Sequence, residues 1–458
     1  MEEVKIYQGD QIGGCVTVIS GIYNGEIHRI MIDYGSSLPG SDNKKDFDYP
    51  WNEKPVDAVF FTHYHGDHAG RIMEIPSSVP LYMGPVARQA MINIQEALGN
   101  NTHMPKEEAE LHLKEALVLK DDRRVRTFEW KNKRYRPIEI PGFRIEPYSV
   151  DHSAYDAYMF LVEADDPERT SGKYITVHTG DFRAHGRRGH RMLDVIDFYI
   201  HKRGKRKVDA LVIEGTMMSR PDEKVLSEPQ MQMEAYKYLS EHKYAFLVCS
   251  STNVDSLASF YRAAQTAAIP YSRYMFVYNE YFMKQLELYT KTAGRFSDVY
   301  RFFRIARLGS EKLLHHKKWD KPKSQREFME DYGFLAVIKP ENYHEHFIDE
   351  FMEAYKEKRI DQKPVIIYSM WEGYLQPKNS RGEDNKAFNK KWYEFIRRQE
   401  AKGVEVKHLH TSGHATTEML AKVIDKIDPQ DKIYPMHTEK ADEFIKLEIK
   451  EELKQRIR

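Results

Sequence analysis

The sequence contains very little cysteine, no excess of either charge and no long apolar run. Its two cysteines, Cys15 and Cys249, are too few for a disulfide framework and fit the reducing cytosol. Lys plus Arg and Asp plus Glu number 70 each, so the chain as a whole has no field that attracts a polyanion. No apolar stretch approaches the ~18 residues of a membrane-spanning helix, and Met1-Glu2-Glu3 does not begin a secretory signal. We therefore expect a soluble, cytoplasmic protein without a membrane partner.

One short stretch is rich in side chains that bind metal ions, and it runs Phe60-Phe61-Thr62-His63-Tyr64-His65-Gly66-Asp67-His68. The apolar residues before Thr62 predict a buried strand, which places His63 and His65 on the same side at its end. Gly66 then turns the chain so that the next carboxylate and imidazole face the same point. Zinc and similar ions accept both kinds of ligand, so the stretch predicts a metal site. A lone His-x-His pair would fit a surface loop as well.

This stretch resembles the signature of the metallo-β-lactamase-fold hydrolases, a family whose site normally holds two metal ions. The resemblance implies further functional residues downstream and upstream. His152 follows a predicted strand, and Asp181 fits a carboxylate shared by the two ions. Asp33 fits an acidic residue that supports the ligands.

Three later motifs are similar to those of the β-CASP domain, a cap found in nuclease members of the same fold. They are Ile213-Glu214-Gly215-Thr216-Met217, His410-Thr411-Ser412-Gly413-His414-Ala415 and Tyr434-Pro435-Met436-His437. Among these nucleases the chain most resembles the ribonuclease J family, over residues 5 to 450. It departs from that family in a long segment at 70–146 and in lacking the additional C-terminal domain that those enzymes often carry. Without that domain, the sequence leaves open whether the chain forms a homodimer.

The pattern of apolar residues predicts an α/β protein. Strands at 16–23 and 27–32 flank the hairpin signal Asn24-Gly25, and a polar loop is expected at 36–55. A helix is expected at 86–98, and another with a solvated charged face at 105–121. Beyond residue 208, strands alternate with amphipathic helices as in a parallel sheet. With the resemblance, this implies a metallo-β-lactamase αββα sandwich, residues 1–215 and 401–458, with an inserted parallel-sheet β-CASP domain at 216–400.

The resemblance also implies how the site works. One ion would be held by His63, His65, His152 and Asp181, and the other by Asp67, His68, Asp181 and His437. Two divalent ions can activate a water for attack on a phosphodiester and stabilise the charge that develops. Zinc is expected first, with manganese or magnesium as alternatives. Asp67 would orient the water, and His414 would donate to the scissile phosphate or leaving oxygen, with Glu214 either positioning it or serving the fold.

Candidate substrate contacts lie in two turns and two basic clusters. By resemblance, Ser250, Ser251, Thr252 and Asn253 would bind the 5′-phosphate of RNA, with Ser412, Gly413 and His414 near the scissile group. A helix N-terminus does bind phosphate, but the same residues also serve as plain N-caps, and the sequence leaves both open. The clusters at 185–191 and 201–207 are candidate nucleic-acid contacts, or solvated faces.

We therefore expect a metal-dependent ribonuclease, acting as a 5′-to-3′ exonuclease, an endonuclease or both, with RNA as its partner. The alternative is a DNA nuclease, or another hydrolase of this fold acting on a phosphate or small ester. A catalytically silent RNA-binding protein is a third possibility. His437 favours RNA, because DNA-directed members of the family tend to carry Val at this position.

Overall fold

The computed structural model describes residues 3–38, 46–101, 104–131, 134–268, 273–293, 299–314, 321–378, 382, 384–385 and 387–458. Two compact units divide the chain: residues 1–225 with 413–458, and residues 226–412. The first unit contains every predicted metal ligand. Among the described residues, no helix is both long enough and apolar enough to cross a membrane.

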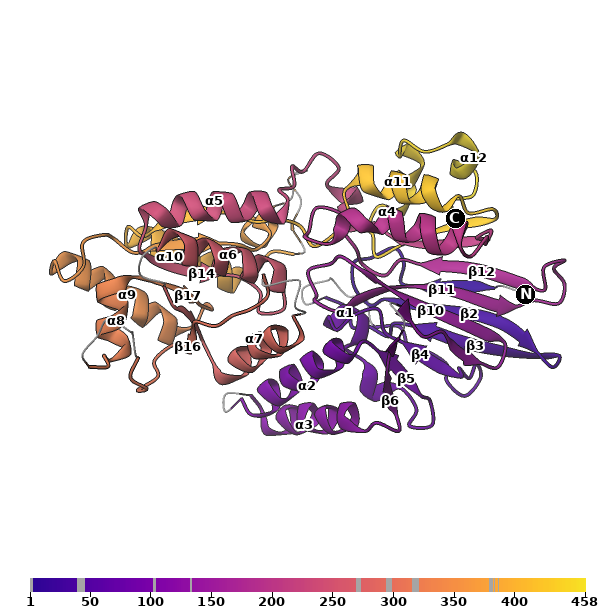
Figure 1. The fold of residues 1–458 in the computed structure, drawn as a ribbon, viewed down its shortest axis with the longest axis horizontal. Helices are drawn as coiled ribbons and strands as arrows, with labels where there is room; N and C mark the ends of the chain where they lie inside the picture. Colours follow the sequence, from indigo (N-terminus) through magenta and orange to yellow (C-terminus); the bar gives the residue numbers. More distant parts are fainter. Residues whose placement is uncertain are drawn as a thin grey trace. The chain divides into compact units, whose positions relative to one another are not determined.

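The first unit is built on two six-stranded sheets, shown in Figure 1. One sheet has the order β1 to β6, formed by Val4–Tyr7, Val16–Tyr23, Glu26–Ile32, Ala58–Phe60, Leu81–Met83 and Val125–Thr127. The other has the order β20-β13-β12-β11-β10-β9, formed by Lys432–Met436, Ala210–Glu214, Lys173–His178, Ala157–Asp165, Phe143–Val150 and Ile138–Ile140. A separate ribbon pairs β7 (Trp130–Lys131) with β8 (Arg134–Tyr135).

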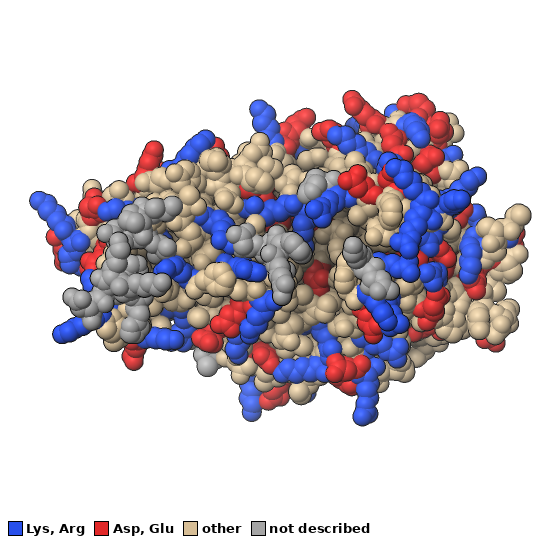
Figure 2. All heavy atoms as spheres, viewed as in Figure 1, with Lys and Arg blue, Asp and Glu red and all other residues tan. Residues whose placement is uncertain are grey.

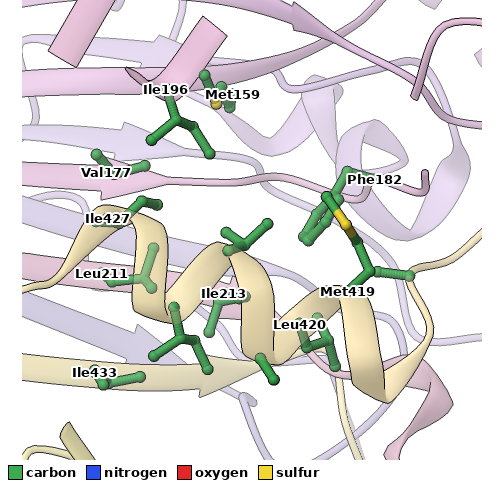
Figure 3. Close-up of a cluster of buried hydrophobic side chains, with 14 of the residues drawn as sticks. Met159, Val177, Phe182, Ile196, Leu211, Ile213, Met419, Leu420, Ile427 and Ile433 are labelled. Carbon is green, nitrogen blue, oxygen red and sulfur yellow. The ribbon is translucent and has the colours of Figure 1, made fainter. Parts of the chain in front are cut away.

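Alternation along the strands explains how the second sheet is covered on both faces. Phe160, Val162 and Val212 point into a core shared with the first sheet. Their neighbours Met159, Leu161 and Leu211 point to the opposite face, where they pack against α11 (Thr417–Ile427). Figure 3 shows this second cluster, with the apolar face of α11 lying over β13 and β20. The helix therefore fixes the strands whose ends carry the site.

The remaining α-helices of the described part of the first unit are α1 (Gly66–Ala69), α2 (Pro85–Gly99), α3 (Lys106–Lys120), α4 (Met192–Val195) and α12 (Glu451–Lys454), and a π-helical turn, Ile196–Lys202, follows α4. The charges of α3 are mostly exposed, as predicted, but the prediction is wrong at Glu115, which is buried. Gln95 of α2 donates a hydrogen bond of 2.8 Å to its carboxyl group, so the packing of α2 on α3 buries this group. The predicted hairpin turn is confirmed, since Asn24 and Gly25 both have positive φ.

The second unit contains the predicted parallel sheet. Its order is β16-β15-β17-β14-β18-β19, formed by Ile305–Arg307, Met275–Val277, Phe334–Val337, Tyr244–Val248, Val365–Tyr368 and Glu405–His408. Its helices are α5 (Glu228–Glu241), α6 (Val254–Ala267), α7 (Glu280–Thr292), α8 (Gln325–Tyr332), α9 (Asn342–Lys356) and α10 (Lys390–Ala401). The α/β class is thus confirmed. Of the predicted loop at 36–55, residues 39–45 lie outside the described residues.

Candidate metal centre

The site forms where parallel strands of both sheets end. The chain leaves β3 at Asp33 and β4 at the His63 stretch, and these strands are parallel neighbours. In the other sheet, β12, β13 and β20 are parallel and end just before Asp181, at Glu214 and just before His437. Because the carboxyl ends of parallel strands meet at one edge of a sheet, residues far apart in the chain converge there.

Three imidazoles make up what we call the first position: His63, His65 and His152. Their ligand atoms all lie within 4.8 Å of one another. The ring centroids of His63 and His152 are 4.6 Å apart, and those of His65 and His152 are 5.2 Å apart. The sequence prediction that a strand delivers His63 and His65 to one point therefore holds in the geometry, and His152 joins them from the end of β10.

The second position is formed by Asp67, His68 and His437. Nε2 of His437 lies 3.1 Å from Oδ2 of Asp67, although 370 residues separate them in the chain. Asp181 lies beside both positions: its Oδ2 is 3.2 Å from Nε2 of His68, and it also groups with His63. This is the placement that the resemblance implies for a carboxylate shared by two ions.

The donor atoms fit a bound cation. Nε2 of His63, Nε2 of His65 and Oδ1 of Asp181 are buried and have no hydrogen-bond partner among the described residues. Buried polar atoms are normally satisfied, because leaving one unpaired costs about 1–3 kcal/mol. Imidazole nitrogens and carboxylate oxygens are the kinds of donor that zinc accepts, and His63 groups with His65 on one side and with Asp181 on the other.

Electrostatics differ between the two positions. Burial and repulsion between neighbouring imidazoles keep the pKa of His63 well below its ordinary value, and burial keeps that of His65 at about 4. Burial likewise lowers the pKa of His152. These rings are therefore neutral at pH 7, which is the form that binds metal.

At the second position, burial disfavours the charged form of each group, but attraction between neighbouring opposite charges outweighs this effect of burial. Asp181 raises the pKa of both His68 and His437. These imidazoles in turn lower the pKa of Asp181, and His68 and His437 lower that of Asp67. The two carboxylates therefore stay ionised and attract positive charge, whether a proton or a metal ion.

Asp33 supports His68 as the resemblance implied. Its Oδ2 accepts a hydrogen bond of 2.8 Å from Nδ1 of His68, which leaves Nε2 of that ring to face Asp181. Its Oδ1 accepts from the backbone N–H of Thr62 at 2.8 Å. Asp33 and His437 also have positive φ, at 61° and 51°, a strained conformation that clusters at functional sites.

The turn that carries Asp181 is held by His178, a residue whose role the sequence did not reveal. Nδ1 of His178 accepts a hydrogen bond of 3.1 Å from the N–H of Gly180, and its Nε2 lies 3.2 Å from Oγ1 of Thr17. Gly180 has φ of 56°, and a Cβ there would meet the carbonyl oxygen of Tyr158 at 2.7 Å. Only glycine fits this turn, so its geometry fixes where the carboxylate points.

Two further contacts fix His152. Its Nδ1 donates to the carbonyl of Gly413 at 2.8 Å, which leaves Nε2 directed toward His65. The preceding residue, Asp151, accepts a hydrogen bond from the guanidinium of Arg183, and both side chains are fully buried. This ion pair joins the loop that carries His152 to the loop that follows Asp181.

Glu214 and His414 lie next to the metal ligands. The carboxylate of Glu214 is fully buried and accepts from the backbone N–H groups of Thr216 and Ala415, both at 2.9 Å. Nδ1 of His414 lies 3.6 Å from Glu214 and 3.6 Å from Asp181, and this side chain keeps 21% of its surface exposed. Glu214 thus orders the backbone directly after His414 as well as its own turn at Thr216, and the imidazole keeps an exposed surface that can meet a substrate.

The turn predicted to bind a 5′-phosphate begins α6 in the second unit. Oδ1 of Asn253 accepts from the N–H of Ser256 at 3.2 Å, so Asn253 is the N-cap of this helix. The N–H groups of Thr252, Asn253 and Val254 also have acceptors within the turn. The N-cap role of Asn253 is therefore observed, and phosphate binding by this turn stays a prediction. Ser412 is buried in the second unit, whereas Gly413 and His414 belong to the first.

The basic clusters are partly engaged with acidic side chains and backbone. Arg206 pairs with Glu146 and Glu163, and Lys202 pairs with Asp197. In the other cluster, Arg188 donates to the carbonyl of Tyr155 at 2.9 Å. Figure 2 shows Lys and Arg interspersed with Asp and Glu over the face that it draws. Part of the predicted basic surface is thus internally neutralised.

Comparison with known proteins agrees with the geometry. Residues 14–83 match the model of the Metallo-beta-lactamase superfamily. The matched residues contain four of the predicted metal ligands, His63, His65, Asp67 and His68, so this segment resembles part of a metallo-beta-lactamase superfamily domain. A search of curated protein sequences finds no match.

Among solved structures, a protein of unknown function from Enterococcus faecalis V583 is similar over 96% of this chain and 95% of its own, with a TM-score of 0.59 and 17% identity. This likeness shows the fold alone. MEM-A1, a subclass B3 metallo-beta-lactamase from a soil metagenome library, matches over 52% of this chain and 82% of its own, with 12% identity. Zinc-bound PqqB from Methylobacterium extorquens matches over 44% and 60%, with 14% identity. Their TM-scores, 0.27 and 0.26, are too low to carry an argument.

Proposed function

We propose that this protein is a metal-dependent ribonuclease that hydrolyses RNA phosphodiesters with an activated water. The observation that carries the proposal is the convergence on one centre of His414 and His437, from the C-terminal segment, with the ligands of the His63 stretch. These two imidazoles belong to the motifs that resemble β-CASP nucleases. Nε2 of His437 lies 3.1 Å from Asp67, and His414 lies 3.6 Å from Asp181.

Two zinc ions are the proposed cofactor. His63, His65, His152 and Asp181 would hold one, and Asp67, His68, Asp181 and His437 the other. When bound, such ions supply a water of lowered pKa and positive charge opposite the developing negative charge of the phosphate. Nε2 of His63 and Nε2 of His65 support this assignment, because both atoms are buried and neither has a hydrogen-bond partner among the described residues.

The chain's own residues would then have separate roles. The carboxylate of Asp67 is held by His437 and can accept a hydrogen bond from the attacking water. His414 is the candidate donor to the scissile phosphate or the leaving oxygen, since it is the part-exposed imidazole beside Asp181. Glu214 is a positioning residue, because Oε1 accepts the backbone N–H of Ala415, the residue after this histidine, and Oε2 lies 3.6 Å from Nδ1 of the histidine itself.

RNA is the proposed substrate because His437 occupies the place where DNA-directed relatives tend to carry Val. We propose that the parallel-sheet unit at 226–412 corresponds to the β-CASP cap and contacts the RNA chain. The balance of 70 basic and 70 acidic residues requires such contacts to be local.

The proposal is tested with RNA and DNA oligonucleotides of one sequence. The purified protein should cleave the RNA, lose activity with a chelator, and regain it when zinc or manganese is restored. The double variant Asp67→Ala, His68→Ala should be inactive and contain less metal by elemental analysis. The control replaces another His–Asp pair, His28 and Asp57, which are 3.1 Å apart and belong to neither position. Full activity in the first variant, or a preference for DNA, would overturn the ribonuclease assignment.

A further inference from the structure

Cys15 lies at the second position, although no sequence motif marked it as functional. It precedes β2, and 7% of its surface is exposed. Its backbone N–H donates to the carbonyl of Asp67 at 3.0 Å, and its carbonyl accepts from the N–H of Gly35 at 3.0 Å. The residue is therefore fixed against the backbone of one predicted ligand.

The thiol of Cys15 is directed toward two more predicted ligands, His68 and His437. Sγ lies 3.8 Å from Nε2 of His68, and the ligand atoms of Cys15, His68 and His437 all lie within 4.8 Å of one another. In a tetrahedral zinc site, bonds of ~2.3 Å to sulfur and ~2.0–2.1 Å to nitrogen place these two atoms about 3.5 Å apart. The observed separation is thus close to that of two ligands on a single ion.

A separate observation concerns Nε2 of His68, the atom that faces the thiol. It also lies 3.2 Å from Oδ2 of Asp181, and the other oxygen of this carboxylate, Oδ1, is buried without a hydrogen-bond partner among the described residues. An unpaired buried oxygen of this kind points to a bound cation beside His68. The other cysteine has no such surroundings. Cys249 lies in the second unit, with its sulfur 3.6 Å from the carbonyl of Ser250, and it belongs to no cluster of His, Asp or Glu among the described residues.

We propose that Cys15 is a thiolate ligand of the ion at the second position, together with His68 and His437. The inference rests on the two-ion site of the proposed function. On binding, the S–H bond breaks, a sulfur–metal bond forms and the proton passes to solvent, with no change of oxidation state. Thiolate is a soft ligand that selects zinc and disfavours magnesium or manganese. The second position is therefore a zinc site, which narrows the choice of metal that the sequence left open.

Spectroscopy of the full chain tests this without an activity assay. Loaded with cobalt(II) in place of zinc, the wild type should show a thiolate-to-cobalt charge-transfer absorption in the near ultraviolet. Cys15→Ser should lose this band, and Cys249→Ser should keep it. X-ray absorption at the zinc edge of the wild-type protein should show a sulfur neighbour at ~2.3 Å. This measurement needs no variant and stands even if Cys15→Ser does not fold.

A cobalt-loaded wild type without the band, or a Cys15→Ser variant that keeps it, would overturn the assignment of this ligand. Failure to bind cobalt or zinc at all would overturn it together with the two-ion site. RNA cleavage, measured on the same samples, separates the two proposals. Cleavage without a sulfur neighbour leaves the ribonuclease and removes the thiolate ligand, whereas a sulfur neighbour without cleavage does the reverse.

Discussion

Asp33→Asn should act as a switch of the His68 tautomer. In the wild type, both carboxylate oxygens accept hydrogen bonds, Oδ1 from the N–H of Thr62, and Oδ2 from Nδ1 of His68 and from the hydroxyl of Thr62. The amide oxygen of Asn would keep the bond to Thr62, which places the NH₂ group against Nδ1. Because NH₂ can only donate, Nδ1 must become the acceptor and the ring proton must move to Nε2. Nε2 is the atom that faces Asp181 and the second position.

The size of the effect follows from this geometry. Losing an outer partner of a ligating histidine typically weakens metal binding by about 10–100-fold. That corresponds to about 1.4–2.8 kcal/mol. Since the variant also forces the wrong tautomer, the loss should lie at the upper end of this range. Folding should suffer less, because the bond from the N–H of Thr62 survives and the side chain keeps its shape.

Calorimetric titration of the metal-free protein with zinc measures the affinity directly. Two binding events are expected in the wild type, and Asp33→Asn should weaken the one assigned to the second position. Asp57→Asn is the matched control, since Asp57 also pairs with a histidine, His28, outside the site. Unchanged zinc affinity in Asp33→Asn, or an equal loss in the control, would refute the reasoning.

Three further predictions address other parts of the chain. His437→Ala should lose RNA cleavage at limiting metal and recover part of it in excess zinc. His414→Ala should not recover, because a group that acts on the substrate cannot be replaced by metal. Equal rescue of both variants by zinc would contradict these roles. If the turn capped by Asn253 binds a 5′-phosphate, RNA with a 5′-monophosphate should be degraded to mononucleotides faster than RNA with a 5′-hydroxyl or 5′-triphosphate. Equal rates on the three RNAs would show that this turn serves only to cap the helix. Burial raises the pKa of Glu115 from 4.5 to about 7. Between pH 4.5 and about pH 7 the folded state therefore binds more protons than the unfolded state, and the free energy of unfolding falls as the pH rises through this range. Glu115→Gln should therefore raise the free energy of unfolding by about 1–3 kcal/mol at pH 8 and hardly change it near pH 4, as measured by urea unfolding.

Part of the site was readable because it is local. His63, His65, Asp67 and His68 are close in the chain, so a strand followed by a turn is enough to bring them together. The hairpin at Asn24-Gly25 and the alternation of strands and helices beyond residue 208 are local signals of the same kind. His152, Asp181 and His437 were assigned by resemblance, since nothing in their spacing places them beside the first stretch.

The tertiary structure decided what depends on contacts between distant segments. Parallel pairing of β13 with β20 places Glu214 opposite Met436, and so beside His437. The contact between Asp67 and the segment that leads into β2 places Cys15 at the second position, although nothing around Cys15 in the sequence indicates metal binding. The same holds for Glu115, whose burial comes from the packing of α2 on α3. Local propensity specifies each element, whereas burial and hydrogen-bond partners belong to pairs of residues that only the folded chain brings into contact.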